Sequence, residues 1–104
     1  MLSVAEVLGP FRERINQLDE QLAEVVAARL RVCAEVAAVK KQKGIPMMQP
    51  DRVDAVREAY AARGSRMGIS PEFMRQLAAM IVAEACRVED EIIDGDTESH
   101  QRVI

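Results

Sequence analysis

The stretch PFRERINQLDEQLAEVVAARLRVCAEVAAVKKQK, residues 10–43, has no glycine and no proline after its first residue, and it decides the fold. Pro10 suits the first turn of a helix and Gly44 suits a helix end, so the stretch predicts one helix from about residue 10 to about residue 43. Such a helix is about 50 Å long at 1.5 Å per residue, whereas a compact domain of this size has a radius of gyration of about 13 Å. We therefore expect it to pack against a second subunit.

Glycines and prolines also mark two further helices. Pro50 starts a helix to about Arg63, and the segment Gly64–Gly68 ends it. The triplet Ser70–Glu72 supplies an N-cap, a proline in the first turn and an early acid for a third helix, which is expected to end near Asp94. The predicted architecture is all-α, with a long, a short and a medium helix.

Composition agrees with this fold class and bounds the domain. Aromatic residues make up only 3% of the chain and tryptophan is absent, while Ala, Val, Leu, Glu and Arg are frequent, which favours helices over sheets. Residues 95–104 are mostly polar. We expect residues 1–94 to form one helical domain, and residues 95–104 to be a disordered tail.

Charge, hydropathy and the rare residue types exclude several functions. The net charge of −3 lacks the concentrated positive charge that nucleic-acid backbones require. No stretch approaches the roughly 20 apolar residues of a membrane span, and no basic leader is visible, so a cytoplasmic location is expected. His100 lies in the polar tail, and Cys33 and Cys86 lack metal-site spacing. We expect no metal and no catalytic triad, and we interpret both cysteines as buried structural thiols.

Two cations occupy an apolar helix face. An apolar stripe with helical spacing comprises Phe11, Ile15, Leu18, Leu22, Val25, Val32 and Val36. Arg29 and Lys40 continue this stripe, and because eleven residues make about three full turns, both should point the same way. A cation on an apolar face needs an anion or a route to solvent. A bound anion, an ion pair with another helix and a snorkelling side chain all remain open.

Glu89 and Arg12 are further candidates. Glu89 lies beside an apolar stripe of the third helix that comprises Leu77, Ile81, Ala85, Val88 and Ile92, where it either takes part in a site or merely neutralises Arg29 or Lys40. Arg12 lies on a different side of the first helix by roughly a quarter turn. It could serve the pocket of another subunit if the long helices run antiparallel.

The segment Phe11–Asp19, followed by Arg29, Lys40, Gly44–Pro46 and Asp51–Arg52, resembles the all-helical chorismate mutases over nearly the whole chain. The resemblance implies an intertwined, cofactor-free homodimer that rearranges a dicarboxylate enol ether. It further implies that Arg12 is donated to the neighbouring subunit's site. Within the subunit, it implies that Arg29 binds a substrate carboxylate and that Lys40 bridges a carboxylate and the ether oxygen. Arg52 is implied to support substrate binding.

The sequence departs from ordinary chorismate mutases at four positions of the implied site. Val53 replaces a Glu that bonds the ring hydroxyl, and Gln49 replaces an Asp. Ala85 replaces a Ser, and Glu89 replaces a Gln that faces the ether oxygen. A ring hydroxyl would lose a partner at Val53, which is costly in a dry site.

The segments Met47–Pro50, Arg52–Val53 and Cys86–Asp90 resemble the 4-amino-4-deoxychorismate mutases of antibiotic pathways, which make a precursor of p-aminophenylalanine. This resemblance implies 4-amino-4-deoxychorismate as the substrate, with Glu89 as a candidate partner for the amino group. Alternatives are an ordinary chorismate mutase, an isochorismate-pyruvate lyase and a non-catalytic helical dimerisation module. The lyases also resemble this chain in having Val after the arginine, but they usually have Gln at position 89.

Overall fold

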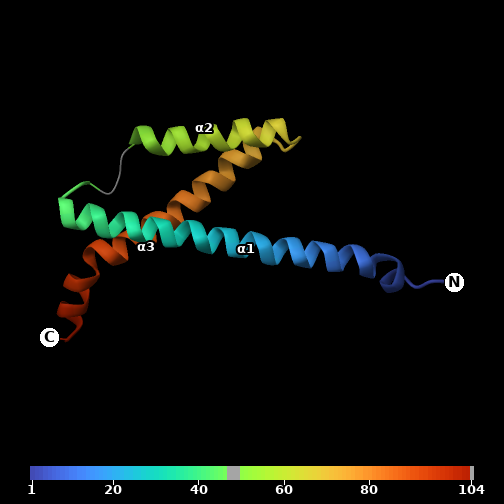
Figure 1. The fold of residues 1–104 in the computed structure, drawn as a ribbon, viewed down its shortest axis with the longest axis horizontal. Coiled ribbons are helices and arrows are strands. Elements are labelled where there is room, and N and C mark those ends of the chain that lie inside the picture. Colours follow the sequence, from blue (N-terminus) through green and yellow to red (C-terminus); the bar gives the residue numbers. More distant parts are fainter. Residues whose placement is uncertain (47–49, 104) are drawn as a thin grey trace.

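The computed structural model describes the backbone of residues 1–46 and 50–103 and the side chains of residues 1–46 and 51–94. Within these ranges the chain forms three helices and no strand: α1 (Val4–Lys43), α2 (Pro50–Arg66) and α3 (Pro71–Val103) (Figure 1). The all-α fold expected from the sequence is confirmed. None of these helices is long and apolar enough to cross a membrane, as far as the described residues go.

The start of α1 differs from the prediction. The helix begins at Val4 and contains Pro10, so the predicted start at Pro10 is wrong. Ser3 is the N-cap, and its Oγ accepts a hydrogen bond of 3.1 Å from the backbone N–H of Glu6. Ser3 Oγ also lies 3.1 Å from Oε1 of Glu6, to which it donates. A cap of this kind satisfies a terminal N–H and lets the helix begin before the proline.

The end of α1 is as predicted. Gly44 follows the helix with φ of 67°, a left-handed conformation that glycine adopts without steric penalty. The carbonyl oxygen of Lys40 accepts hydrogen bonds from the N–H of Gly44 and, at 2.9 Å, from that of Ile45. These bonds end the helix at Lys43.

The other helix ends lie beyond their predicted positions. α2 extends past Arg63 to Arg66, because Gly64 stays helical and its carbonyl oxygen accepts bonds from the next residues, including one of 2.8 Å from the N–H of Ile69. The backbone of α3 continues past Asp94 to Val103, since a single glycine at position 95 without a following proline does not end a helix. The domain boundary at residue 94 stays a prediction.

The third helix begins as predicted and joins the other two. Ser70 Oγ accepts a hydrogen bond of 3.2 Å from the N–H of Phe73 at the start of α3. From there α3 runs beside α2 and then crosses α1, while the described backbones of α1 and α2 stay apart (Figure 1). Arg75 on α3 donates two hydrogen bonds, of 3.1 and 3.2 Å, to the carboxylate of Glu58 on α2. α3 is therefore the element that places α1 relative to α2.

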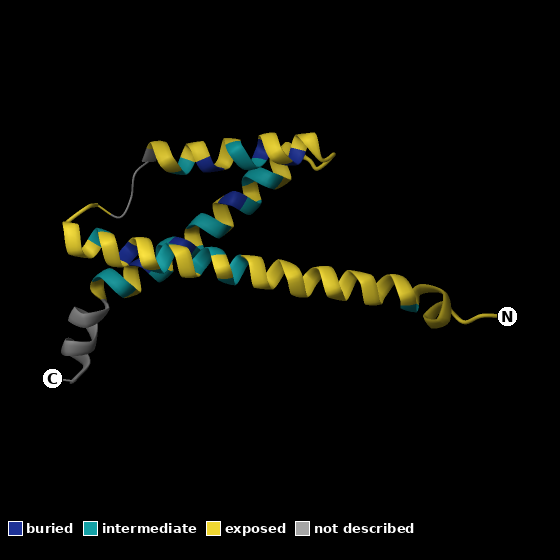
Figure 2. Cartoon of the chain, in the orientation of Figure 1, coloured by how far each residue is buried: buried dark blue, intermediate teal, exposed yellow. Residues whose placement is uncertain are grey.

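The molecule is too open to bury its apolar surface alone. It measures 66 × 36 × 17 Å with a radius of gyration of 19.1 Å. Its accessible surface is 8131 Å², against about 5,800 Å² for a compact monomer of this mass. The N-terminal half of α1 is almost entirely exposed in Figure 2, and the exposed fraction is 57% for Phe11 and 61% for Leu18. The apolar stripe of α1 therefore has no cover within this chain over much of its length.

The core between the helices is built mostly from small residues. The most buried apolar side chains among the described residues are Ala37, Val56, Ala61, Ala78 and Ala85. Small side chains let helices approach closely, and Gly64 of α2 is the extreme case, because a Cβ at this position would overlap Cγ of Met74 on α3. The close contact between α2 and α3 thus depends on a missing side chain.

Gly64→Ala should lower the free energy of unfolding. Overpacking costs about 1–3 kcal/mol and the helix propensity of alanine returns up to about 1 kcal/mol. Taken at about 2 kcal/mol and about 1 kcal/mol, these effects leave an expected net loss of about 1 kcal/mol. Urea denaturation of Gly64→Ala, Met74→Ala and the double variant provides the test. The two losses should be less than additive, because Met74→Ala removes the overlapping atom. A Gly64→Ala protein as stable as the parent would show that α2 and α3 are not in close contact here.

Candidate active site

A cavity of about 440 Å³ is lined by residues of all three helices. α1 contributes Arg29, Val32, Cys33, Val36 and Lys40. α2 contributes Arg52, Val53 and Val56, and α3 contributes Val82, Ala85, Cys86 and Glu89. The lining thus combines an apolar wall of valines and Ala85 with three cations and one carboxylate.

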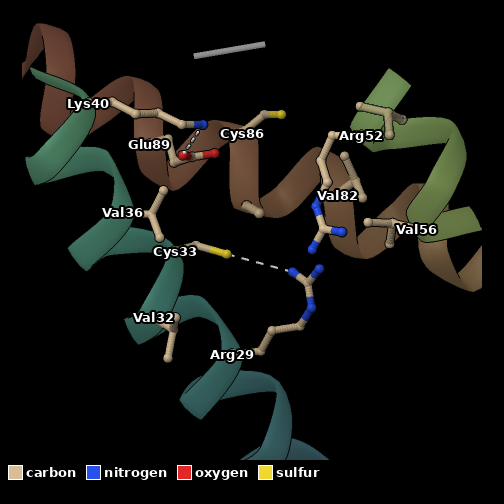
Figure 3. A pocket seen from close by; sticks show the side chains of 12 residues that line it. Arg29, Val32, Cys33, Val36, Lys40, Arg52, Val56, Val82, Cys86 and Glu89 are labelled. Carbon is tan, nitrogen blue, oxygen red and sulfur yellow. Dashed lines mark hydrogen bonds and ion pairs between the residues drawn. The ribbon is translucent and has the colours of Figure 1, made fainter. Parts of the chain in front are cut away.

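Helical spacing places these side chains. Arg29, Cys33, Val36 and Lys40 are separated by three or four residues, so they lie on one face of α1. This confirms the prediction that Arg29 and Lys40 point the same way. Figure 3 shows the Lys40 side chain at one end of the pocket and the guanidinium group of Arg29 at the other.

Lys40 and Glu89 form an ion pair across the pocket. Nζ of Lys40 donates a hydrogen bond of 3.0 Å to Oε1 of Glu89, and the two side chains are only 16% and 10% exposed. Charges that are this well shielded from water need a partner. Glu89 therefore neutralises Lys40, one of the two cations considered from the sequence, and the pair fixes both groups on the cavity wall.

Arg29 and Arg52 have no such partner. Among the side chains that the structure describes, no carboxylate pairs with either residue, and Nη1 of Arg29 donates a hydrogen bond of 3.6 Å to Sγ of Cys33. Figure 3 shows the two guanidinium groups directed towards one another, Arg29 from α1 and Arg52 from α2. Two like charges that face each other over a partly enclosed cavity favour a bound anion between them.

Both cysteines lie in the pocket, where the sequence predicted only structural thiols. Cys33 and Cys86 are half-buried and line the cavity from α1 and α3. Burial raises the pKa of the Cys86 thiol, and the nearby carboxylates of Glu89 and Asp90 raise it further. Cys86 thus presents a neutral thiol, and the contact between Cys33 and Arg29 is a feature of the pocket that the sequence interpretation missed.

The remaining predicted site residues divide into three groups. Arg52, Val53 and Ala85 line the cavity, and Ala85 is only 5% exposed. Arg12 is exposed on the N-terminal part of α1 and lies outside the cavity of its own chain. Gln49 lies outside the described residues. Over the described part of the chain, no group of three His, Cys, Asp or Glu side chains is placed to hold a metal ion.

Comparison with known proteins assigns the chain to a family. The model of the family "Chorismate mutase type II" matches residues 11–90. The chain is 35% identical over 91 residues to a 4-amino-4-deoxychorismate mutase of Streptomyces pristinaespiralis, covering 88% of this chain and 70% of that one. A 4-amino-4-deoxychorismate mutase of Streptomyces venezuelae is 33% identical, with 86% and 87% covered.

A more distant relative is the T-protein of Haemophilus influenzae, which is 29% identical over 86% of this chain and 24% of its own length. No solved structure gives a significant match. The family match spans the helices that build the pocket, from the stripe of α1 to Glu89 of α3. The chain therefore belongs to the type II chorismate mutase family and is an isomerase of that kind.

Proposed function

We propose that the chain catalyses the [3,3]-sigmatropic rearrangement of a chorismate-type dicarboxylate, with 4-amino-4-deoxychorismate, an intermediate of antibiotic biosynthesis, as the preferred substrate. The observation that carries the proposal is the pair of guanidinium groups, Arg29 and Arg52, which have no carboxylate partner among the described side chains and lie at one end of a cavity whose other end has Lys40. Among the described lining residues, three cations and one carboxylate give a net charge of +2, which complements a substrate with two carboxylates.

The rearrangement needs no nucleophile, general base or metal. It requires a substrate folded so that its two reacting carbons approach, and such positioning supplies a large part of the acceleration. The valines and Ala85 supply an apolar wall for the ring, while Arg29 and Arg52 bind a carboxylate. The enzyme thus uses its binding groups to select the compact conformer.

Lys40 is the group proposed to act on the transition state. The carbon–oxygen bond stretches before the new carbon–carbon bond is complete, so negative charge grows on the ether oxygen. A cation already fixed beside that oxygen stabilises the transition state more than the ground state. Oε1 of Glu89 accepts a hydrogen bond of 3.0 Å from Nζ of Lys40 and therefore fixes the position of this cation on the cavity wall.

The proposed substrate rests on Val53 and on the two named relatives. Val53 lines the cavity and offers no acceptor to a ring hydroxyl, and the two most similar relatives named above are both 4-amino-4-deoxychorismate mutases. Glu89 is the carboxylate of the described lining and thus the proposed partner of an ammonium. Ordinary chorismate is the alternative substrate, which the family name supports.

We further propose an intertwined homodimer in which Arg12 enters the neighbouring subunit's pocket. The exposed stripe of α1 needs a cover, and Arg12 lies in the same exposed half of the helix. A second copy of α1 would bury the stripe and bring an additional cation. The cytoplasm, as expected from the sequence, remains the proposed location.

Two alternatives predict different results. A non-catalytic dimerisation module needs apolar stripes but no inward cations, so it gives no reason for Arg29 and Arg52 to face one cavity. An isochorismate-pyruvate lyase would release pyruvate. Offering chorismate, isochorismate and 4-amino-4-deoxychorismate in parallel, with each product identified by NMR, separates all of these functions. If the protein converts none of these three compounds, the proposal is rejected.

Arg29→Ala should lower kcat/KM at least hundredfold while the protein stays folded, because loss of one preorganised cation costs about 10²–10³ in rate. Lys40→Gln should have a similar effect, and this substitution keeps a hydrogen-bond donor for Glu89. Arg31→Ala is the matched control, since Arg31 is exposed on the same helix outside the cavity. Steady-state kinetics with circular dichroism provides the measurement. Full turnover by folded Arg29→Ala protein would show that Arg29 only forms structural contacts.

Mixing Arg12→Ala chains with Arg29→Ala chains should restore activity. Each heterodimer would have one intact pocket and one doubly damaged pocket, so random exchange should return about a quarter of the parent activity. Exchange is followed with one chain carrying an affinity tag. If exchange is complete and no activity returns, Arg12 does not reach the neighbour's site.

The parent protein should use 4-amino-4-deoxychorismate with a higher kcat/KM than chorismate, by roughly tenfold to a hundredfold, because an unpaired buried hydroxyl costs about 1–3 kcal/mol. Val53→Glu should lower the ratio of kcat/KM for the amino substrate to kcat/KM for chorismate, because the new carboxylate can accept a hydrogen bond from the ring hydroxyl of chorismate. Val53→Leu, which changes only size, is the control and should leave the ratio unchanged. Equal or better use of chorismate by the parent protein would reject the amino substrate.

A further inference from the structure

Cys33 makes a polar contact in the pocket, so its role is not only to pack against apolar neighbours. Its Sγ lies 3.6 Å from Nη1 of Arg29, which donates the hydrogen bond, and both side chains line the same cavity. The two residues are one helical turn apart on α1, so the helix backbone itself brings them together. Among the described residues, Sγ of Cys33 is the atom that accepts a hydrogen bond from the Arg29 guanidinium group (Figure 3).

We propose that Cys33 is a positioning residue, which holds the guanidinium group of Arg29 at the carboxylate-binding end of the pocket without neutralising it. The inference rests on the proposed function, in which Arg29 binds a substrate carboxylate. An arginine side chain has many rotamers, and fixing one of them before the substrate arrives removes part of the entropic cost of binding.

The thiol is chemically suited to this role. A carboxylate at position 33 would pair with Arg29 and compete with the substrate, as Glu89 pairs with Lys40 at the other end of the cavity. An aliphatic side chain would offer no acceptor. Sulfur is a weak acceptor, so it engages one of the five N–H donors of the guanidinium and leaves the charge and the other donors to the substrate.

Cys86 provides the comparison within the same pocket. It lines the cavity from α3, but its thiol lies near the carboxylates of Glu89 and Asp90, and the contact with the Arg29 guanidinium is made by Cys33. Replacing Cys86 removes a thiol of equal size from the same cavity. The two cysteines thus separate the effect of the hydrogen bond from the effect of lost packing.

The first test compares Cys33→Ala, Cys33→Ser and Cys86→Ala by steady-state kinetics. Loss of a weak hydrogen bond that serves ground state and transition state alike should raise KM about twofold to tenfold with kcat nearly unchanged. Serine keeps an acceptor and should restore KM to within about twofold. Cys86→Ala removes a thiol from the same lining without removing a contact to Arg29, so its effect on KM should be smaller than that of Cys33→Ala. Equal effects of Cys33→Ala and Cys86→Ala, or no rescue by serine, would overturn the proposal.

The second test needs no turnover and separates this inference from the proposed function. In the substrate-free protein, ¹⁵N relaxation of the Arg29 Nε–H group, assigned with Arg29→Lys, reports how well the side chain is ordered. The Arg29 Nε–H group should be less ordered in Cys33→Ala than in the parent protein, whereas it should stay ordered in Cys33→Ser and Cys86→Ala. Unchanged order in Cys33→Ala would reject the positioning role, even in an active enzyme. A loss of order in a protein that converts none of the three chorismate-type compounds would support the positioning role and reject only the proposed function.

Discussion

The ion pair between Lys40 of α1 and Glu89 of α3 is the contact on which the pocket depends. Its length is 3.0 Å and both side chains are largely shielded from water. Such groups are costly to bury singly, because each loses its hydration, but together they satisfy one another. The pair therefore fixes the crossing of α1 and α3 at the cavity. It also explains why Lys40→Gln is a better probe than Lys40→Ala, which would leave Glu89 without this partner.

The ion pair makes the two ends of the cavity electrostatically different. At one end the positive charge of Lys40 is balanced by Glu89, while at the other end Arg29 and Arg52 face one another without a carboxylate among the described side chains. Like charges repel in a partly desolvated site, so an incoming carboxylate relieves unfavourable energy as well as adding hydrogen bonds. In the proposed reaction, the guanidinium end binds the substrate and the ammonium end acts on the breaking bond.

The sequence predicted the features that follow from regular helical geometry. The interval of eleven residues between Arg29 and Lys40 was sufficient to place both on one face of α1, and Ser70 with Pro71 located the start of α3. The start of α1 does not follow from Pro10, because the cap formed by Ser3 lets the helix begin earlier, at Val4. Arg52 and Val53 entered the predicted site only through the family resemblance, since periodicity within one helix gives no information about how α2 packs on α3.

The interaction of Cys33 with Arg29 was missed for a different reason. A cysteine among valines and alanines has the same pattern as any small apolar residue, and only the side-chain geometry reveals its contact with a guanidinium. The exposed stripe of α1 is a second case in which the sequence is not sufficient. Its spacing predicts that another surface covers it, but does not identify that surface. Both features concern α1, and the exposed stripe bears on whether one chain alone forms a complete site.

The central claim is that the cations of this pocket bind a dicarboxylate in its compact, transition-state-like conformation. Calorimetric titration with a bicyclic dicarboxylate that mimics this conformation tests the claim most directly, using the parent protein, Arg29→Ala and Arg31→Ala. We expect one tight site per chain, weakened by at least a hundredfold in Arg29→Ala and unchanged in Arg31→Ala. Weak binding to the parent protein, or equal binding to all three proteins, would contradict the account.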